Sequence, residues 1–146
     1  MKKLPLHQIF QIFIDPIIQK TNKKTINELG FAPIDEPLLK EVFKKEHKIT
    51  MEFGKKLLLP KPELILATKI NSIKNRDKEH KRIKDLCDIA AITLYSGTPI
   101  NKLINKTKNK TKQKINIEQE DIEKTSDNTQ IPKEIIKNII EQINQT

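Results

Sequence analysis

Apolar side chains recur at helical spacing between Pro62 and Ile73. Their stripe comprises Ile65, Leu66, Ile70 and Ile73. This spacing predicts an amphipathic helix, and Pro62 with Glu63 suits its first turn, where a missing N–H costs nothing and a negative charge meets the helix dipole. Lys69 falls inside the stripe, where a lysine is costly unless its ammonium reaches solvent or an anion. Lys69 is therefore either a snorkelling side chain or a cation held over a phosphate or a carboxylate.

A second predicted helix, which follows a short charged link, has apolar residues on two sides. One side carries Ile83, Leu86, Cys87, Ala90, Ala91 and Leu94, and the other carries Ile89, Ile92 and Tyr95. A helix that is apolar on two sides is expected to be buried on both. Asp85 and Asp88 share one face near the second side, because they are three residues apart. Such a pair can hold a divalent cation, position a base, or pair with Lys69 or Arg76, whereas Asp85 also suits an exposed first turn.

The link between the two helices, residues 74–82, contains five cations, two acids and one histidine. This composition is typical of a solvated helix connection, and its functional interpretation is a loop that contacts phosphates. We interpret His80 as a surface residue, because His7 and His47 are too far away in sequence to form a zinc-ligand spacing with it.

The N-terminal part is predicted to begin with a strand. Residues 6–14 are β-branched and aromatic, which is typical of a buried strand, and this strand is expected to end at Asp15-Pro16. A helix or an irregular crossover then extends to Gly30. Asp35 is expected to cap a helix that runs to about Lys45.

A β-hairpin is predicted to lead into the first of the two central helices. Apolar and polar residues alternate from Ile49 to Phe53, and the apolar run 57–59 follows after Gly54. The second strand of this hairpin delivers the chain to Pro62. Lys69 is therefore expected to lie on a helix that a small sheet supports.

The last third of the chain is predicted to comprise the end of the domain, a linker and a final helix. Ser96-Gly97 is expected to stop the second central helix, and Pro99 to open a short helix. Residues 105–130 are polar apart from three isoleucines, which predicts a flexible linker. Pro132 opens a last helix with a narrow isoleucine stripe, which docks on the domain, pairs with its own copy or holds an antitoxin-like partner. The predicted organisation is a domain over 1–104, a linker over 105–130 and an amphipathic helix over 131–146.

Composition favours a small basic protein of the cytoplasm. The chain has 146 residues, no tryptophan, and a formal net charge of +9, which favours polyanionic partners such as nucleic acid, nucleotides or an acidic protein. Cys87 cannot form an internal disulfide because it is the only cysteine. The N-terminal apolar run is too polar for a signal peptide and too short to span a membrane.

The order of motifs around the two central helices resembles a known family. The run Leu59-Pro-Lys-Pro-Glu-Leu-Ile-Leu-Ala-Thr-Lys-Ile70 is followed by Arg76 and then by Lys84-Asp-Leu-Cys-Asp-Ile89. It resembles the distal part of the nucleotidyltransferase-like toxins of the AbiEii/AbiGii family, in which a "P-x-P-E-x-L-L-A-x-K-L" helix is followed by an Arg and a "K-D-x-x-D-I/L" helix. The resemblance covers residues from about 49 to 96, or from 8 if the first strand is included.

The resemblance implies a DNA polymerase β-like nucleotidyltransferase fold, here a partial one of the α+β class. It implies Mg²⁺-dependent transfer of a nucleotide from a nucleoside triphosphate to an RNA acceptor, tRNA in some members, or to a protein. By the same resemblance, Lys69 contacts the triphosphate, with Arg76 and Lys84 as further phosphate contacts. Asp88, with Asp85 beside it, corresponds to the late acidic motif of the site.

The chain departs from the family pattern in the half that binds metal. Such enzymes open with a strand, a Gly-Ser turn and paired acids, but no Gly-Ser dipeptide occurs here. The first predicted strand carries Gln8 and Gln11 where the pattern has an acid, and Asp15, the nearby acid, is more typical of a turn. The chain is therefore interpreted as a distal fragment, a half-site completed by a partner, or a relative without catalysis.

Two other functional interpretations remain beside nucleotidyl transfer. In the first, the chain is a non-catalytic basic module that binds RNA or a partner protein. In the second, Lys69 pairs with Asp88 inside the core for structural reasons, and no open cleft lies beside the pair.

Overall fold

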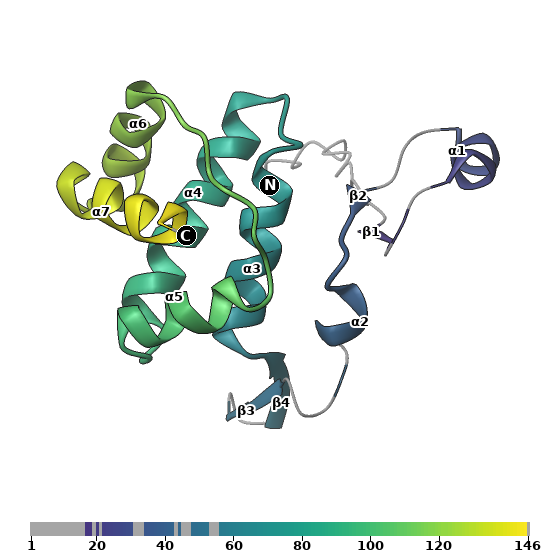
Figure 1. Cartoon of the computed structure of the whole chain (residues 1–146), viewed down its shortest axis with the longest axis horizontal. Coiled ribbons are helices and arrows are strands. Elements are labelled where there is room, and N and C mark those ends of the chain that lie inside the picture. Colours follow the sequence, from purple (N-terminus) through teal and green to yellow (C-terminus); the bar gives the residue numbers. More distant parts are fainter. Residues whose placement is uncertain are drawn as a thin grey trace, which may run out of the picture.

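The computed structural model describes residues 17–18, 20, 22–30, 34–42, 44, 48–52 and 56–145. This part of the chain is mostly helical (Figure 1). The elements are β1 (Ile17–Ile18), α1 (Lys23–Leu29), β2 (Ile34–Asp35), α2 (Leu39–Val42), β3 (Lys48–Glu52), β4 (Lys56–Pro60), α3 (Pro62–Ile73), α4 (Glu79–Tyr95), α5 (Ile100–Lys108), α6 (Gln119–Thr129) and α7 (Lys133–Asn144). The strands pair in two separate sheets, β1 with β2 and β3 with β4. The predicted α+β class therefore agrees only loosely with this mostly helical structure.

Helices α3 and α4, the two predicted central helices, lie side by side and supply a large part of the core (Figure 1). Leu66 and Ile70 of α3 are fully buried against Leu86 and Ile89 of α4. Helix α4 ends where the sequence predicts, because Gly97 adopts a φ of 73°, which favours glycine. None of the helices in the described ranges is both long and apolar enough to cross a bilayer.

Residues 105–130 do not form the flexible linker that their composition predicts. Helix α5 continues to Lys108, an extended segment follows over residues 109–118, and α6 is a regular helix. Ile115 and Ile122 are buried in the same core as α3 and α4, with exposed fractions of 2% and 8%. A few well-placed isoleucines thus anchor a stretch that is polar on average.

Polar contacts also fix this stretch in place. Arg82 of α4 donates two hydrogen bonds to the buried Asp121 of α6, from Nε at 3.0 Å and from Nη2 at 2.8 Å. The Ile115 backbone N–H donates to Asn144 Oδ1 at 2.8 Å, and Asn144 Nδ2 donates back to the Ile115 carbonyl at 2.9 Å. The segment 109–118 crosses in front of α3 and α4 in Figure 1 and is held at its middle by α7.

The last helix docks on the core, which was one of the three predicted arrangements. Its isoleucine stripe contributes Ile136, Ile139, Ile140 and Ile143 to the core that contains α3 and α4. Ile135, on the edge of the stripe, is 42% exposed. Because α5, α6 and α7 share one core with α3 and α4, the predicted boundaries at residues 104 and 130 do not separate independent cores.

The predicted hairpin is confirmed. Strands β3 and β4 pair in antiparallel register, with Ile49 opposite Leu59, and β4 leads directly into α3. The predicted stop at Gly30 is also confirmed, because Gly30 follows α1 with a φ of 74°.

The helix predicted from Asp35 to Lys45 is wrong in its bounds. Asp35 lies in β2, and α2 comprises only Leu39–Val42. Glu36 takes the place of the expected cap, because its carboxylate accepts a hydrogen bond from the Leu38 N–H at 2.9 Å. The predicted strand over 6–14 and the candidate Asp15 lie outside the described residues.

Candidate functional site

Four charged side chains and one hydroxyl converge where α3 packs against α4. Asp85 Oδ1 accepts a hydrogen bond from Lys69 Nζ at 3.0 Å. Asp85 Oδ2 accepts two more, from Ser72 Oγ at 3.0 Å and from Arg76 Nε at 2.7 Å. Lys69 Nζ also lies 2.6 Å from Asp88 Oδ2. The structure therefore brings together four of the five predicted site residues.

Helical periodicity explains why these residues meet. Lys69 and Ser72 are spaced i and i+3, so they lie on one face of α3, and Arg76 follows from the link just after the helix end at Ile73. Asp85 and Asp88 are spaced i and i+3 on α4. The link between the helices turns the chain back, so that α4 runs antiparallel to α3 and the later part of α3 faces the earlier part of α4.

The surroundings favour the ionised forms of Asp85 and Lys69. Asp85 is 2% exposed; burial would raise its pKa, but hydrogen bonds from Arg76 and Lys69 outweigh burial and hold the pKa below its usual value. Burial would lower the pKa of Lys69, but hydrogen bonds to Asp88 and Asp85 outweigh it, so this pKa is raised. The cluster is a coupled network of ion pairs at neutral pH.

An open pocket lies beside this network, between α2 and α3. Its volume is about 230 Å³, and it is lined by Glu36, Leu39, Val42, Thr68, Lys69, Ser72 and Arg76. The Lys69 and Arg76 side chains retain exposed fractions of 28% and 21%. The structural interpretation of the Lys69 pair requires that no cleft lie beside it, and this pocket is such a cleft.

Arg76 has unused hydrogen-bond donors at the pocket. A guanidinium carries five N–H donors, and Arg76 commits only its Nε–H to Asp85. Within the described ranges, the Nη donors of Arg76 have no hydrogen-bond partner. Asp85 therefore fixes the orientation of the guanidinium while its outer edge stays available to a ligand.

The described residues do not fit the predicted Mg²⁺. A magnesium site needs carboxylate oxygens that are free to coordinate the ion. Both oxygens of Asp85 already accept hydrogen bonds, and Asp88 is paired with Lys69. Within the described ranges, no group of three or more His, Cys, Asp or Glu residues is arranged to hold a metal.

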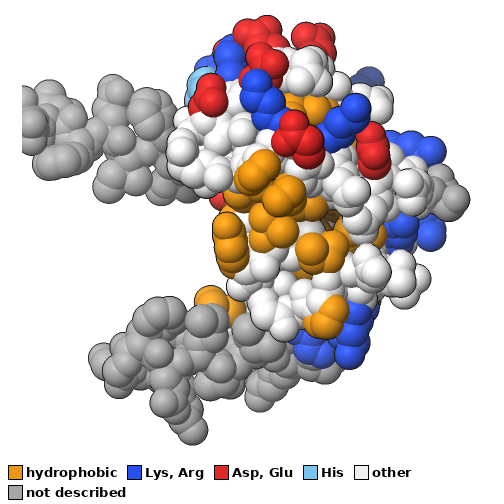
Figure 2. Space-filling model, turned by 90° about the vertical axis from the view of Figure 1, so that its left-hand side faces the viewer, with side chains coloured by type: hydrophobic (Ala, Val, Ile, Leu, Met, Phe, Trp, Pro, Cys, Tyr) orange, Lys and Arg blue, Asp and Glu red, His pale blue; other side chains and the backbone are white. Residues whose placement is uncertain are grey.

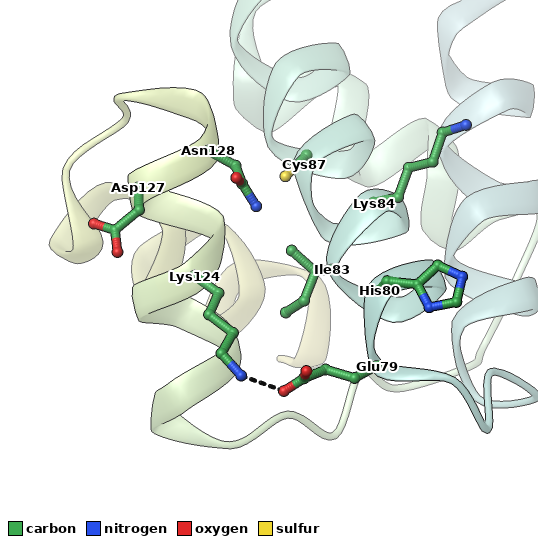
Figure 3. Close-up of a pocket in the computed structure, with 8 residues that line it drawn as sticks. All are labelled: Glu79, His80, Ile83, Lys84, Cys87, Lys124, Asp127 and Asn128. Carbon is green, nitrogen blue, oxygen red and sulfur yellow. Dashed lines mark hydrogen bonds and ion pairs between the residues drawn. The ribbon is translucent and has the colours of Figure 1, made fainter.

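Lys84, the fifth predicted site residue, lies in a different place. It lines a pocket of about 560 Å³ between α4 and α6, together with Glu79, His80, Ile83, Cys87, Lys124, Asp127 and Asn128. Figure 3 shows Lys84 pointing away from the α6 residues, while Glu79 reaches across to pair with Lys124.

Burial, together with the charge of Asp88, raises the pKa of the Cys87 thiol, which keeps it in the unreactive thiol form.

The sequence analysis missed three residues near the candidate site. Ser72 is a hydrogen-bond donor to Asp85, and its position three residues after Lys69 was the available signal. Glu36 is buried in the pocket wall, where burial raises its pKa although Leu38 N–H and Asn71 donate hydrogen bonds to it. No local pattern links Glu36 to Asn71, because 35 positions separate them.

The second apolar side of α4 is not buried as predicted. Ile89 is buried, but Ile92 is only half-buried and Tyr95 is 75% exposed. An apolar groove of about 410 Å³ runs beside them, lined by Leu59, Pro60, Pro62, Ile65, Ala91, Ile92, Tyr95 and Ser96. Figure 2 shows hydrophobic side chains gathered on one face of the molecule, below a band of charged ones.

Comparison with known proteins does not assign the chain to a family. No family model, curated protein or solved structure matches it. The resemblance to the AbiEii/AbiGii toxins therefore stays a prediction that depends on the motif residues themselves.

Proposed function

We propose that this chain supplies the phosphate-binding side of a nucleotidyltransferase-like site. In this proposal, the pocket between α2 and α3 receives the phosphates of a nucleoside triphosphate. Lys69 and Arg76 contact the phosphate oxygens, and Asp85 orients both cations. The observation that carries the proposal is that Arg76 is anchored through Nε to a buried carboxylate while its Nη donors have no partner in the described part of the chain.

The geometry of a guanidinium supports this role for Arg76. Its planar donors match two phosphate oxygens at once, and such charge-assisted bonds are stronger than neutral ones. Asp85 holds the group with a 2.7 Å hydrogen bond, so little side-chain freedom is lost when an anion binds.

Lys69 is able to exchange one of its partners for a phosphate. Asp88 is 37% exposed, whereas Asp85 is 2% exposed. An incoming phosphate displaces the more exposed carboxylate, and Lys69 keeps its hydrogen bond to the buried one. Asp88 is then released toward solvent or toward an acceptor group, which fits the late acidic role that the family resemblance gives it.

The size of the pocket limits which part of a nucleotide it receives. Pockets that enclose whole small molecules typically measure about 300–1,000 Å³. At about 230 Å³, this one suits the phosphates, while the sugar and base lie outside it. Mg²⁺ and the chemical step require carboxylates other than Asp85 and Asp88, and we assign no catalytic step to the described residues.

The proposal is tested by titrating the protein with a fluorescent nucleoside triphosphate. Arg76→Lys keeps the positive charge but removes the planar donors. We expect this variant to bind about tenfold more weakly, since one charge-assisted hydrogen bond contributes about 1.5 kcal/mol.

Arg82→Lys is the matched control for this titration. Arg82 also donates to a buried aspartate, Asp121, but it does not line the pocket. We expect its affinity for the triphosphate to equal that of the wild type. Equal affinity of Arg76→Lys and wild type would instead favour the alternative, in which the network is structural and the chain is a binding module for RNA or a partner protein.

A further inference from the structure

Three lysines line a small pocket between the segment 109–118 and the end of α7. The pocket has a volume of about 130 Å³, and it is lined by Lys108, Thr111, Lys112, Gln113, Lys114, Ile143, Asn144 and Gln145. No carboxylate side chain belongs to this lining. The pocket is thus a positively charged hollow that α5, the extended segment and the end of α7 build together.

These lysines differ from the neighbouring ones in the same run. Lys106 and Lys110 are neutralised, at 3.7 Å from Glu63 and 2.8 Å from Glu41. The side-chain ammonium groups of Lys108, Lys112 and Lys114 have no ion pair or hydrogen bond within the part of the chain that the structure describes. The run therefore contains a paired set of lysines that fixes the segment and an unpaired set that lines the pocket.

The backbone beneath the unpaired lysines is held in place. Ile115 is buried and exchanges two hydrogen bonds with Asn144, and Thr111 Oγ1 donates to Asn71 Oδ1 at 2.5 Å. Like charges that are held together in this way repel one another unless an anion lies between them. In Figure 2, acidic side chains gather at the top of the view with basic ones among them, and further basic side chains lie along the right-hand edge and at the bottom.

A chain of hydrogen bonds connects this segment to the candidate site. Thr111 donates to Asn71 of α3, and Asn71 donates to Glu36 at 3.4 Å. Glu36 lines the pocket that contains Lys69 and Arg76. The segment that carries the lysine pocket therefore lies beside the wall of the proposed phosphate site.

We propose that Lys108, Lys112 and Lys114 form a backbone-phosphate subsite for a single-stranded nucleic acid. The ammonium groups neutralise phosphodiester charges without reading the bases. That the strand runs toward Lys69 rests on the proposed function, in which the nucleic acid is the acceptor of the transferred nucleotide. Binding at the three lysines itself does not depend on that function.

The experiment measures the anisotropy of a fluorescein-labelled oligouridylate of about 12 nucleotides against protein concentration at several salt concentrations. For single strands, each phosphate contact contributes about 0.7 to the slope of log affinity against log salt. Replacing all three lysines with alanine is therefore expected to weaken binding and to reduce the magnitude of the slope by about 2. An unchanged slope and affinity would overturn the proposal.

A charge-matched control separates a site from the general effect of net charge. Lys23, Lys102 and Lys137 are exposed and line none of the described pockets, and their triple replacement by alanine removes the same charge. The proposal requires this control to retain more affinity than the Lys108/Lys112/Lys114 variant. An equal loss in both variants would show that only net charge matters.

Two further measurements test whether the bases are recognised and where the oligonucleotide binds. Equal binding of a thymidine oligonucleotide supports recognition of the backbone alone. Displacement of the oligonucleotide by ATP from wild type but not from Arg76→Lys, together with equal oligonucleotide affinity of wild type and the lysine variant, would place the strand in the candidate site alone and overturn this proposal.

The two proposals fail in different measurements. If the protein does not bind the triphosphate but binds the oligonucleotide through the three lysines, the proposed function is wrong and the lysine subsite stands. If the protein binds the triphosphate but the oligonucleotide binds equally well without the three lysines, the proposed function stands and the subsite is wrong.

Discussion

At the scale of single residues, Asp85 organises the site. It is nearly fully buried, and both of its oxygens accept hydrogen bonds from Lys69, Ser72 or Arg76. A buried charge is tolerated only when it is paired and hydrogen-bonded. Asp88 also pairs with Lys69 but is much more exposed. The two aspartates that look alike in sequence are therefore expected to differ in their effect on stability.

We expect Asp85→Asn to lower the free energy of unfolding by about 3 kcal/mol, because it leaves two cations without their buried counter-charge. Asp88→Asn is expected to lower it by at most about 1 kcal/mol, since half-exposed pairs contribute little. Urea unfolding followed by circular dichroism measures both. Equal effects of the two substitutions would contradict the central place given to Asp85.

The same pair of proteins tests the pH dependence. The pKa of Asp85 is lowered in the folded state, so the unfolded chain binds more protons between that pKa and the ordinary value. The stabilisation by Asp85 is therefore complete above about pH 4 and is lost as the pH falls through the folded pKa. The difference in stability between wild type and Asp85→Asn should narrow in acid. A constant difference would show that the carboxylate charge is not what stabilises the fold.

The sequence predicted much of the site because chemistry and periodicity coincide there. Lys69, Asp85 and Asp88 stand at spacings that a helix pair brings together, and Arg76 joins them from the link after α3. Lys84 belongs to the same motif, but its position next to Asp85 turns it to another face of α4. The pocket beside Lys69 was not predictable, because Glu36 reaches it from an element distant in sequence.

At the scale of elements, helix boundaries were predicted well where prolines and glycines mark them. Pro62 and Pro132 stand at the starts of α3 and α7, and Gly30 and Gly97 lie just beyond helix ends. The stretch 105–130 was predicted wrongly because average composition hides the few residues that are buried. Long-range partners such as Asn144 give no local signal in that stretch.

Ile115 tests the order of the segment 109–118. If this residue anchors the segment as described, Ile115→Ala should lower the free energy of unfolding by about 3 kcal/mol, the typical cost of a buried isoleucine truncation. The neighbouring Asn116 is exposed, so Asn116→Ala serves as the control and should change stability little. Equal stabilities of the two variants in urea would indicate that the segment is a tether.

At the scale of the whole molecule, the net charge of +9 is not spread evenly. In the site between α3 and α4, two cations are balanced by two aspartates. In the pocket at the end of α7, three lysines are unbalanced within the described ranges. This division suits a protein that positions a triphosphate with fixed donors and attracts a nucleic acid with free charge. The sequence predicted the charge but not this division, since burial and pairing decide it.

The central claim is that Arg76 offers its free donors to phosphate. The most direct measurement follows the guanidinium N–H signals of Arg76 by NMR in ¹⁵N-labelled protein while ATP is added, with assignment from Arg76→Lys. The account predicts saturable shifts of the Arg76 Nη–H signals, slower exchange of their protons with water, and no change at Arg82. Unchanged Arg76 signals at ATP concentrations that saturate binding, or the absence of ATP binding by the folded protein, would contradict it.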